Sequence, residues 1–236
     1  LIAAPELVNN GSVTAQDGQV ILAAASKLTA TGNPADALKG ILNPVVEQGG
    51  NLVNNGIVQS LQGNVTLLGK NINQNGVVGS TTSLTRQGSI DIRAQESIGG
   101  SLTPSHTGYF EFGKNSVTTV LLSDNGETTT SSDSATAAVK PSTLNISAGA
   151  ITFSENALLL APGAKLNLIA YYEKGNAAPS PIPDRQFVAG RVFMDQKATL
   201  NVAGMPNVFA TENTLLNIPR IGLNELANSP LLRDSF

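Results

Sequence analysis

The residues that most often carry out enzyme chemistry are few in this chain and widely separated. It has one histidine, His106, and no cysteine, so a Ser-His-Asp triad would have to use His106, and disulfides and cysteine-based metal sites are excluded. His106 lies in a turn-like segment, residues 103–108, that contains Pro104 and Gly108. Such a segment favours a solvent-exposed or turn-capping side chain. The histidine therefore predicts no catalytic site.

Paired carboxylates are the second chemistry to consider, because glycan hydrolases use them and polysaccharide lyases add Ca²⁺ and a Lys or Arg base. The chain has 17 acidic residues but no Asp-Asp pair. The closest acids, Asp124 and Glu127, fall in a polar low-complexity run where a solvated surface is expected. Folding could still bring together Asp91, Glu111 and Asp195. The sequence assigns no catalytic, cofactor-binding or metal-binding residue, and we expect no enzyme.

An internal repeat predicts the elements that would position any site. Residues 7–22 and 52–67 share one frame: an apolar residue, an Asn-rich turn ending in Gly, an apolar pair, a second Gly and an apolar-polar-apolar triplet. A third copy starts at Ile72, takes a five-residue insertion and closes at 88–92. The apolar positions alternate with period 2, which is typical of strands. A strand repeat of about 20–25 residues predicts a solenoid, whose coils are stable only when they stack.

The closing triplet sets the expected register. The following matching positions are predicted to point into the core: Val20, Val65, Ile90, Leu144, Leu166 and Leu200. We interpret the gaps of 45 and 54 residues as two coils each, those of 25 and 22 as one, and that of 34 as one coil plus a loop. At roughly 23 residues per coil the chain would make about ten coils. At ~4.8 Å per coil, the rod would be about 45–50 Å long.

Two further features have a functional and a structural interpretation. The Asn-Gly pairs at 10–11, 55–56 and 75–76 could form a ligand-contacting rim, but we favour turns in which Gly reaches positive φ and stacked Asn amides bond along the axis. Tyr171 and Tyr172, beside a proline-rich segment, could form a binding patch, but we favour a loop wrapped over the shaft.

Composition narrows the class of protein. Only 13% of residues are charged, the net charge is −3 and no basic run exists, which argues against nucleic-acid binding. No segment reaches the roughly 18 apolar residues of a membrane span. The chain begins inside a strand-like run, so we interpret it as a piece of a longer protein. Bare coil ends predict frayed terminal residues and concentration-dependent end-to-end association.

The expected organisation is one β-helical segment over residues 1–236, with excursions near 31–44, 123–142 and 171–187. Residues 35–42 could form one or two helical turns. Strands are predicted at 109–112 and 117–122, and a strand pair at 208–218. The loops at 99–142 and 171–187 are the candidate contact surfaces.

The repeats resemble the coils of filamentous haemagglutinin-like large exoproteins, which are two-partner-secreted adhesins of Gram-negative bacteria. The segments that carry this resemblance are residues 1–24, 76–90 and 224–234. The resemblance is vague over residues 99–141 and 171–190. It implies that the fold is a right-handed parallel β-helix. It also implies that the chain is a fragment of the shaft and does not recognise the secretion pore.

The resemblance implies a structural or adhesive shaft segment of a secreted or surface-bound exoprotein that mediates attachment. The parent's partners would be an outer-membrane secretion pore and a host-surface protein or glycan; no cofactor is implied. One alternative is a carbohydrate-active β-helix enzyme, a polysaccharide lyase or hydrolase, which would need a groove with three or more convergent carboxylates and a base. Another is a haem- or host-protein-binding module, whose available haem ligands are His106, three Tyr and two Met.

Overall fold

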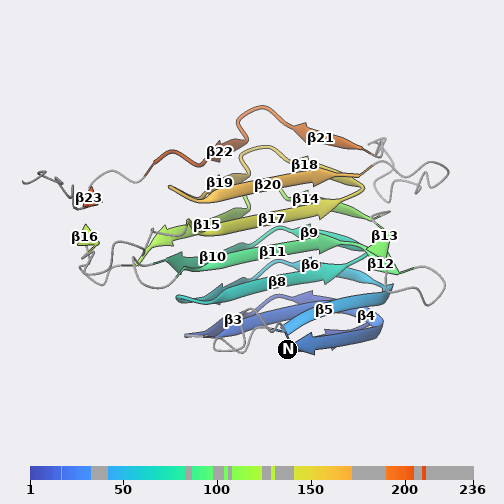
Figure 1. Ribbon diagram of the computed structural model, residues 1–236. Helices are drawn as coiled ribbons and strands as arrows, with labels where there is room; N and C mark the ends of the chain where they lie inside the picture. The colour runs from blue at the N-terminus through green and yellow to red at the C-terminus, as the bar shows by residue number, and fades with distance from the viewer. Residues whose placement is uncertain are drawn as a thin grey trace, which may run out of the picture.

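The computed structural model describes residues 1–16, 18–32, 42–82, 87–97, 104–105, 108–123, 129–130, 141–171, 190–204 and 209–210. All regular structure in these residues is β-strand, and most strands lie in three parallel sheets (Figure 1). This confirms the predicted all-β parallel solenoid. Within the same residues, no helix has the length and apolar character that would let it cross a membrane.

The three sheets form three faces that run along the molecule. Sheet A contains β1 (Ile2–Ala4), β4 (Gln19–Gly32), β8 (Asn64–Gly69), β11 (Ser89–Ala94), β17 (Thr143–Ala148) and β20 (Lys165–Ala170). Sheet B contains β2 (Glu6–Asn9), β6 (Asn51–Asn54), β9 (Asn71–Gln74), β14 (Tyr109–Phe112), β18 (Ala150–Phe153) and β21 (Arg191–Met194). Sheet C contains β3 (Ser12–Ala15), β7 (Ile57–Ser60), β10 (Val77–Thr82), β15 (Val117–Leu122), β19 (Leu158–Leu160) and β22 (Thr199–Asn201). Strands β14 and β15 confirm the strands predicted there.

One strand from each sheet, in the order A, B, C, makes a coil, and the described residues form six coils. The predicted ten was too many for this part of the chain, because long insertions within and between some of the coils take up many residues. Val20 pairs directly with Val65, and Ile90 with Leu144, so the gaps of 45 and 54 residues each span one coil rather than two. Leu200 pairs with Leu159 in sheet C, so it does not continue the sheet A column that ends at Leu166.

The core consists of columns of side chains stacked from coil to coil. All six residues predicted to point inward either belong to the core or pack against it, which confirms that prediction. In sheet B the column changes character along the rod. Asn9 Nδ2 donates to Asn54 Oδ1 at 2.7 Å, and Asn54 Nδ2 donates to Gln74 Oε1 at 2.6 Å. The next two positions are Phe112 and Phe153, whose rings stack 4.2 Å apart. A buried amide ladder thus gives way to a buried aromatic stack.

The corner between sheets B and C, here the BC corner, is short in every described coil. In the first three coils it holds the Asn-Gly pairs, and their amides do stack: Asn55 Nδ2 donates to Asn10 Oδ1, and Asn75 Nδ2 to Asn55 Oδ1, both at 2.9 Å. The expected positive φ at these glycines was wrong. A Cβ on Gly56 would lie 2.0 Å from the carbonyl oxygen of Gly11, so glycine is required there by the close approach of stacked backbones.

Positive φ appears instead at the BC corners of the last three coils. Asn115, Asn156 and Lys197 have φ of 59°, 60° and 63°. These corners are tight turns; in one of them the Ala157 amide donates to the Ser154 carbonyl at 3.0 Å. Asparagine tolerates this left-handed conformation better than most residues, which explains its place at two of the three corners.

The corner between sheets A and B, the AB corner, carries insertions in alternate coils. Strand connections are immediate in coils one, three and five, where β1, β8 and β17 each end two residues before the next strand begins. In coil two, β4 continues beyond the sheet and pairs antiparallel with β5 (Leu42–Gly49). In coil four, β12 (Glu96–Ser97) and β13 (Pro104–Ser105) pair antiparallel and lie against β5 (Figure 1). In coil six, residues 171–190 separate β20 from β21.

Several sequence expectations fall mainly outside the described residues. Residues 33–41, which hold most of the expected helical turns, are outside, while the flanking residues 31–32 and 42–44 belong to β4 and β5. Of residues 124–140, only β16 (Thr129–Thr130) is described, paired with β23 (Phe209–Ala210). Residues 172–187 and 211–218 are outside, so the loop and the strand pair expected there stay predictions.

Candidate functional site

The residues that the sequence singled out for chemistry do not meet in one place. His106, Asp124, Glu127 and Tyr172 lie outside the described residues. Asp91 is in β11 of sheet A, Glu111 is in β14 of sheet B, and Asp195 follows β21 at a BC corner. Within the described part of the chain, no three His, Cys, Asp or Glu side chains are grouped so that they could hold a metal ion.

Glu111 lies in a polar cluster on the outer face of sheet B. Its Oε1 accepts a hydrogen bond from Ser154 Oγ at 2.5 Å. Tyr109, two residues earlier on the same strand, accepts a hydrogen bond from Asn73 Nδ2 at 3.1 Å through its hydroxyl oxygen. Burial raises the pKa of Tyr109, opposed by the Asn73 contact and reinforced by the charge of Glu111. Tyr109 is only 8% exposed, so this cluster is a poor candidate for ligand contact.

The outer face of sheet A is the better candidate for ligand contact. The hairpin β4–β5 covers the part of this face that belongs to the first coils. The hairpin folds back over this face and buries a small apolar cluster of its own: Ile21, Ala23, Ala25, Val46 and Leu68, with Leu28 packed against it. Two polar contacts hold the hairpin in place. Gln19 clasps the backbone of Leu42, donating to its carbonyl at 3.0 Å and accepting from its amide at 2.8 Å. Arg93 Nη1 donates to Asn43 Oδ1 at 3.2 Å.

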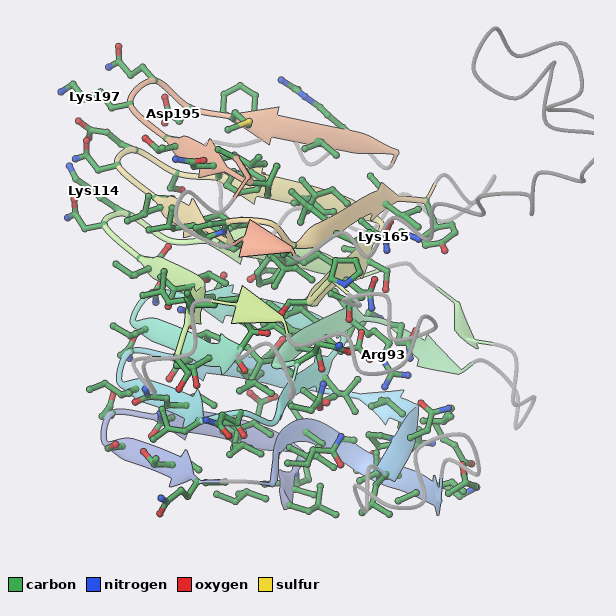
Figure 2. The ribbon with its side chains drawn as sticks, turned by 60° about the vertical axis from the view of Figure 1, so that its left-hand side comes forward. Arg93, Lys114, Lys165, Asp195 and Lys197 are labelled. Atoms are coloured by element: carbon green, nitrogen blue, oxygen red, sulfur yellow. The ribbon has the colours of Figure 1, made fainter. Side chains whose placement is uncertain are left out.

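Above the hairpin lies a row of polar residues, which we call the polar strip: Asp91, Asn145 and Asn167, with Arg93 and Lys165 alongside. Asp91, Asn145 and Asn167 are register partners on β11, β17 and β20, so their side chains stack about 4.8 Å apart. Asn167 Nδ2 donates to Asn145 Oδ1 at 2.7 Å. Figure 2 shows Arg93 and Lys165 on the same side of the rod. The polar strip thus presents a carboxylate, amides and two cations from three successive coils.

The strip's charges are coupled. Arg93 Nε lies 3.1 Å from Asp91 Oδ2, and the two side chains are 17% and 29% exposed. Despite this distance, the geometry at Arg93 Nε does not make a hydrogen bond. The two side chains therefore interact through their opposite charges rather than through an aligned hydrogen bond. Burial raises the pKa of Asp91, and the charge of Arg93 only partly offsets that effect. A half-buried carboxyl with a raised pKa and a cation beside it is a feature that recurs at functional sites as well as in structural ion pairs.

Replacing Asp91 with Asn should stabilise the protein at neutral pH. Because the folded-state pKa is raised, the charged form of Asp91 costs stability at every pH above that pKa, and an amide removes the cost. The advantage of Asp91→Asn should shrink as pH falls through the raised pKa and vanish below about pH 3.9, the usual value for aspartate. Urea unfolding across a pH series measures this difference. A difference of the same size at every pH would show that packing, not charge, causes it.

The BC corner carries a second row of charges, on a different edge from the polar strip. Glu155 bridges the coils on either side, 2.8 Å from Lys114 Nζ and 3.3 Å from Lys197 Nζ. Hydrogen bonds from Lys114 and then Lys197 hold the pKa of Glu155 below its usual range. Lys114 and Lys197 project outward along this edge in Figure 2. The two lysines are exposed and Glu155 is partly exposed, so the row contributes little to stability.

Sequence reasoning identified Asp91 but missed the polar strip around it. The signal was present: Ser89, Asp91 and Arg93 alternate with buried isoleucines and therefore share the outer face. What the sequence could not show is which residues stack above them and where the hairpin ends. No family model, no curated protein and no solved structure matches this chain. The geometry of the rod is therefore the main guide to function.

Proposed function

We propose that this chain is a structural and adhesive shaft segment of a secreted bacterial surface exoprotein. The parent protein would leave the cell through an outer-membrane pore and would use the segment to hold contact surfaces away from the cell. The resemblance of the repeats to filamentous haemagglutinin-like exoproteins motivates the class. The architecture supports the role, because a stack of coils with a filled core makes a stiff spacer.

One observation carries the adhesive part of the proposal: insertions leave the AB corner at alternate coils. They follow β4, β11 and β20, in coils two, four and six. Successive insertions are therefore two coil spacings apart, which is about 10 Å along the rod. The first two are in contact through β5, β12 and β13. The BC corner carries no insertion in any described coil. An edge that bears insertions at every second coil can offer a partner several contacts at once, which raises avidity.

Bead adhesion tests the proposal. Fluorescent beads coated with the chain would be washed over epithelial monolayers and over immobilised mixed glycans, with beads coated with an inert protein as reference. We expect retention above the reference, reduced by soluble chain. Two variants with short Gly-Ser links in place of residues 124–140 and 172–189 test the candidate contact loops. Retention equal to that of the inert protein on both surfaces would contradict the adhesive role.

A further inference from the structure

Three turns of this rod contain the dipeptide most prone to spontaneous deamidation. In an Asn-Gly pair the backbone nitrogen of Gly can attack the side-chain carbonyl of Asn, because Gly offers no side chain to hinder the approach. The pairs at 10–11, 55–56 and 75–76 all sit at the BC corner, and Asn10, Asn55 and Asn75 are all exposed. The same dipeptide therefore occurs three times in nearly the same turn, but in three different environments.

We propose that Asn10, in the first coil of this chain, is a site of spontaneous deamidation when the chain of residues 1–236 is folded, and that stacking on a preceding coil protects Asn55 and Asn75. In the reaction the nitrogen of Gly11 forms a bond to Cγ of Asn10, and the Cγ–Nδ2 bond breaks. Nδ2 leaves as ammonia with the amide proton of Gly11, and a cyclic imide remains. Water then opens one of the two imide C–N bonds, giving aspartate or isoaspartate.

The attacking nitrogen is restrained in the second and third coils. The amide of Gly56 donates to the carbonyl of Asn9 at 3.0 Å, and that of Gly76 donates to the carbonyl of Asn54 at 2.8 Å. Both are backbone bonds to the preceding coil, and ring closure must break them. The amide of Gly11 instead donates at 3.2 Å to the side chain of Asn9, two residues before it. That contact is local and longer, so the Gly11 nitrogen is the most available of the three.

The side-chain amide group that leaves in the reaction is also more restrained at Asn55 and Asn75 than at Asn10. Asn55 and Asn75 each donate through Nδ2 to the Asn below. Asn75 is also confined from above, since a Cβ on Gly113 would lie 2.0 Å from Asn75 Oδ1. Asn10 only accepts a bond in this ladder, through Oδ1. Around the glycines the space differs as well: a Cβ on Gly11 would meet nothing nearer than Asn9 Oδ1 at 4.0 Å, whereas one on Gly76 would lie 2.1 Å from the Gly56 carbonyl.

Peptide mapping by mass spectrometry, with fragmentation that separates aspartate from isoaspartate, tests the proposal. The folded chain and the chain in concentrated urea would be aged in parallel at mildly alkaline pH. In urea we expect the three Asn-Gly sites of the BC corner to react at similar rates, together with the fourth Asn-Gly pair of the sequence, at 125–126. In the folded chain we expect Asn10 to react at least about tenfold faster than Asn55 or Asn75. Ring closure at each of those breaks two hydrogen bonds to the preceding coil, whereas at Asn10 it breaks only the local bond from the Gly11 amide to Asn9.

Gly11→Ala is the matched control. It keeps Asn10 and its contacts, fits the space available, and hinders ring closure at that site alone. We expect it to suppress the product at position 10 and to leave the folded chain's melting curve almost unchanged. Equal rates at the three sites of the folded chain would overturn the proposal. So would an unreacted Asn10 in folded samples aged until the urea sample has converted.

Discussion

Replacing Phe153 with alanine should cost the protein about 3–5 kcal/mol of unfolding free energy, the range for removing a buried aromatic ring from a core. Phe153 is fully buried, its ring stacks 4.2 Å from that of Phe112, and Phe112 in turn packs edge-on against Phe110. Because each coil is stabilised mainly by its neighbours, a cavity in coil five weakens contact with the coils on both sides. Urea unfolding followed by far-ultraviolet circular dichroism measures the loss.

Phe193→Ala is the control for this effect. Phe193 lies on β21, the next strand of the same sheet, but it points outward, is 36% exposed and packs beneath the guanidinium of Arg191. Its loss should cost about 1 kcal/mol or less, the value of an exposed cation–π contact. Equal losses for the two variants would mean that the inward and outward columns of sheet B have been assigned incorrectly.

Gly56→Ala should be a strongly destabilising single-methyl change at the BC corner. The added Cβ would lie 2.0 Å from the carbonyl oxygen of Gly11, a backbone atom that cannot move unless two coils separate. We expect a loss of at least about 2–3 kcal/mol, the upper part of the range for overpacked sites. The midpoint of thermal unfolding, measured at one pH and protein concentration, should fall accordingly.

Gly11→Ala adds the same methyl group at the equivalent turn of the first coil, where the space is open and φ is not positive. It should leave stability unchanged or raise it by about 0.4–1 kcal/mol, because alanine restricts the unfolded chain. If Gly11→Ala were as damaging as Gly56→Ala, the glycines would be required for backbone conformation. The original expectation of positive φ would then be correct after all.

The sequence was sufficient to predict the fold class, because period-2 alternation and a repeating Asn-Gly turn leave few other arrangements. It was not sufficient to count coils. The 45-residue gap between Val20 and Val65 matches two coil lengths, yet much of it, residues 25–32 and 42–49, forms an antiparallel hairpin beside the rod. Alternation reports which side of a strand is buried, not which strand lies beside it. For the same reason Leu200 was correctly placed inward but on the wrong sheet.

The polar strip shows a similar limit. The outward direction of Asp91 and Arg93 follows from the pattern of β11, but their surroundings come from the hairpin and from strands more than 50 residues later in the chain. The glycine turns show another limit, since residue type alone does not distinguish a glycine needed for positive φ from one needed for close backbone approach. Local pattern therefore predicted the elements, while the stacking of coils determined what surrounds each side chain.

Cysteine cross-linking tests the coil register most directly. Because the chain has no native cysteine, only the introduced cysteines can form disulfides. Glu6, Asn51 and Asn71 form an outward column on sheet B, in which Asn51 is the register partner of both others. Stacked partners lie about 4.8 Å apart, within disulfide reach, whereas two coils separate Glu6 from Asn71 by about 10 Å. The account predicts efficient disulfide formation for the pairs 6/51 and 51/71 and none for 6/71. Efficient disulfide formation between positions 6 and 71, or its failure between 6 and 51, would contradict the six-coil rod. Either result would show that residues 45 positions apart do not lie on neighbouring coils.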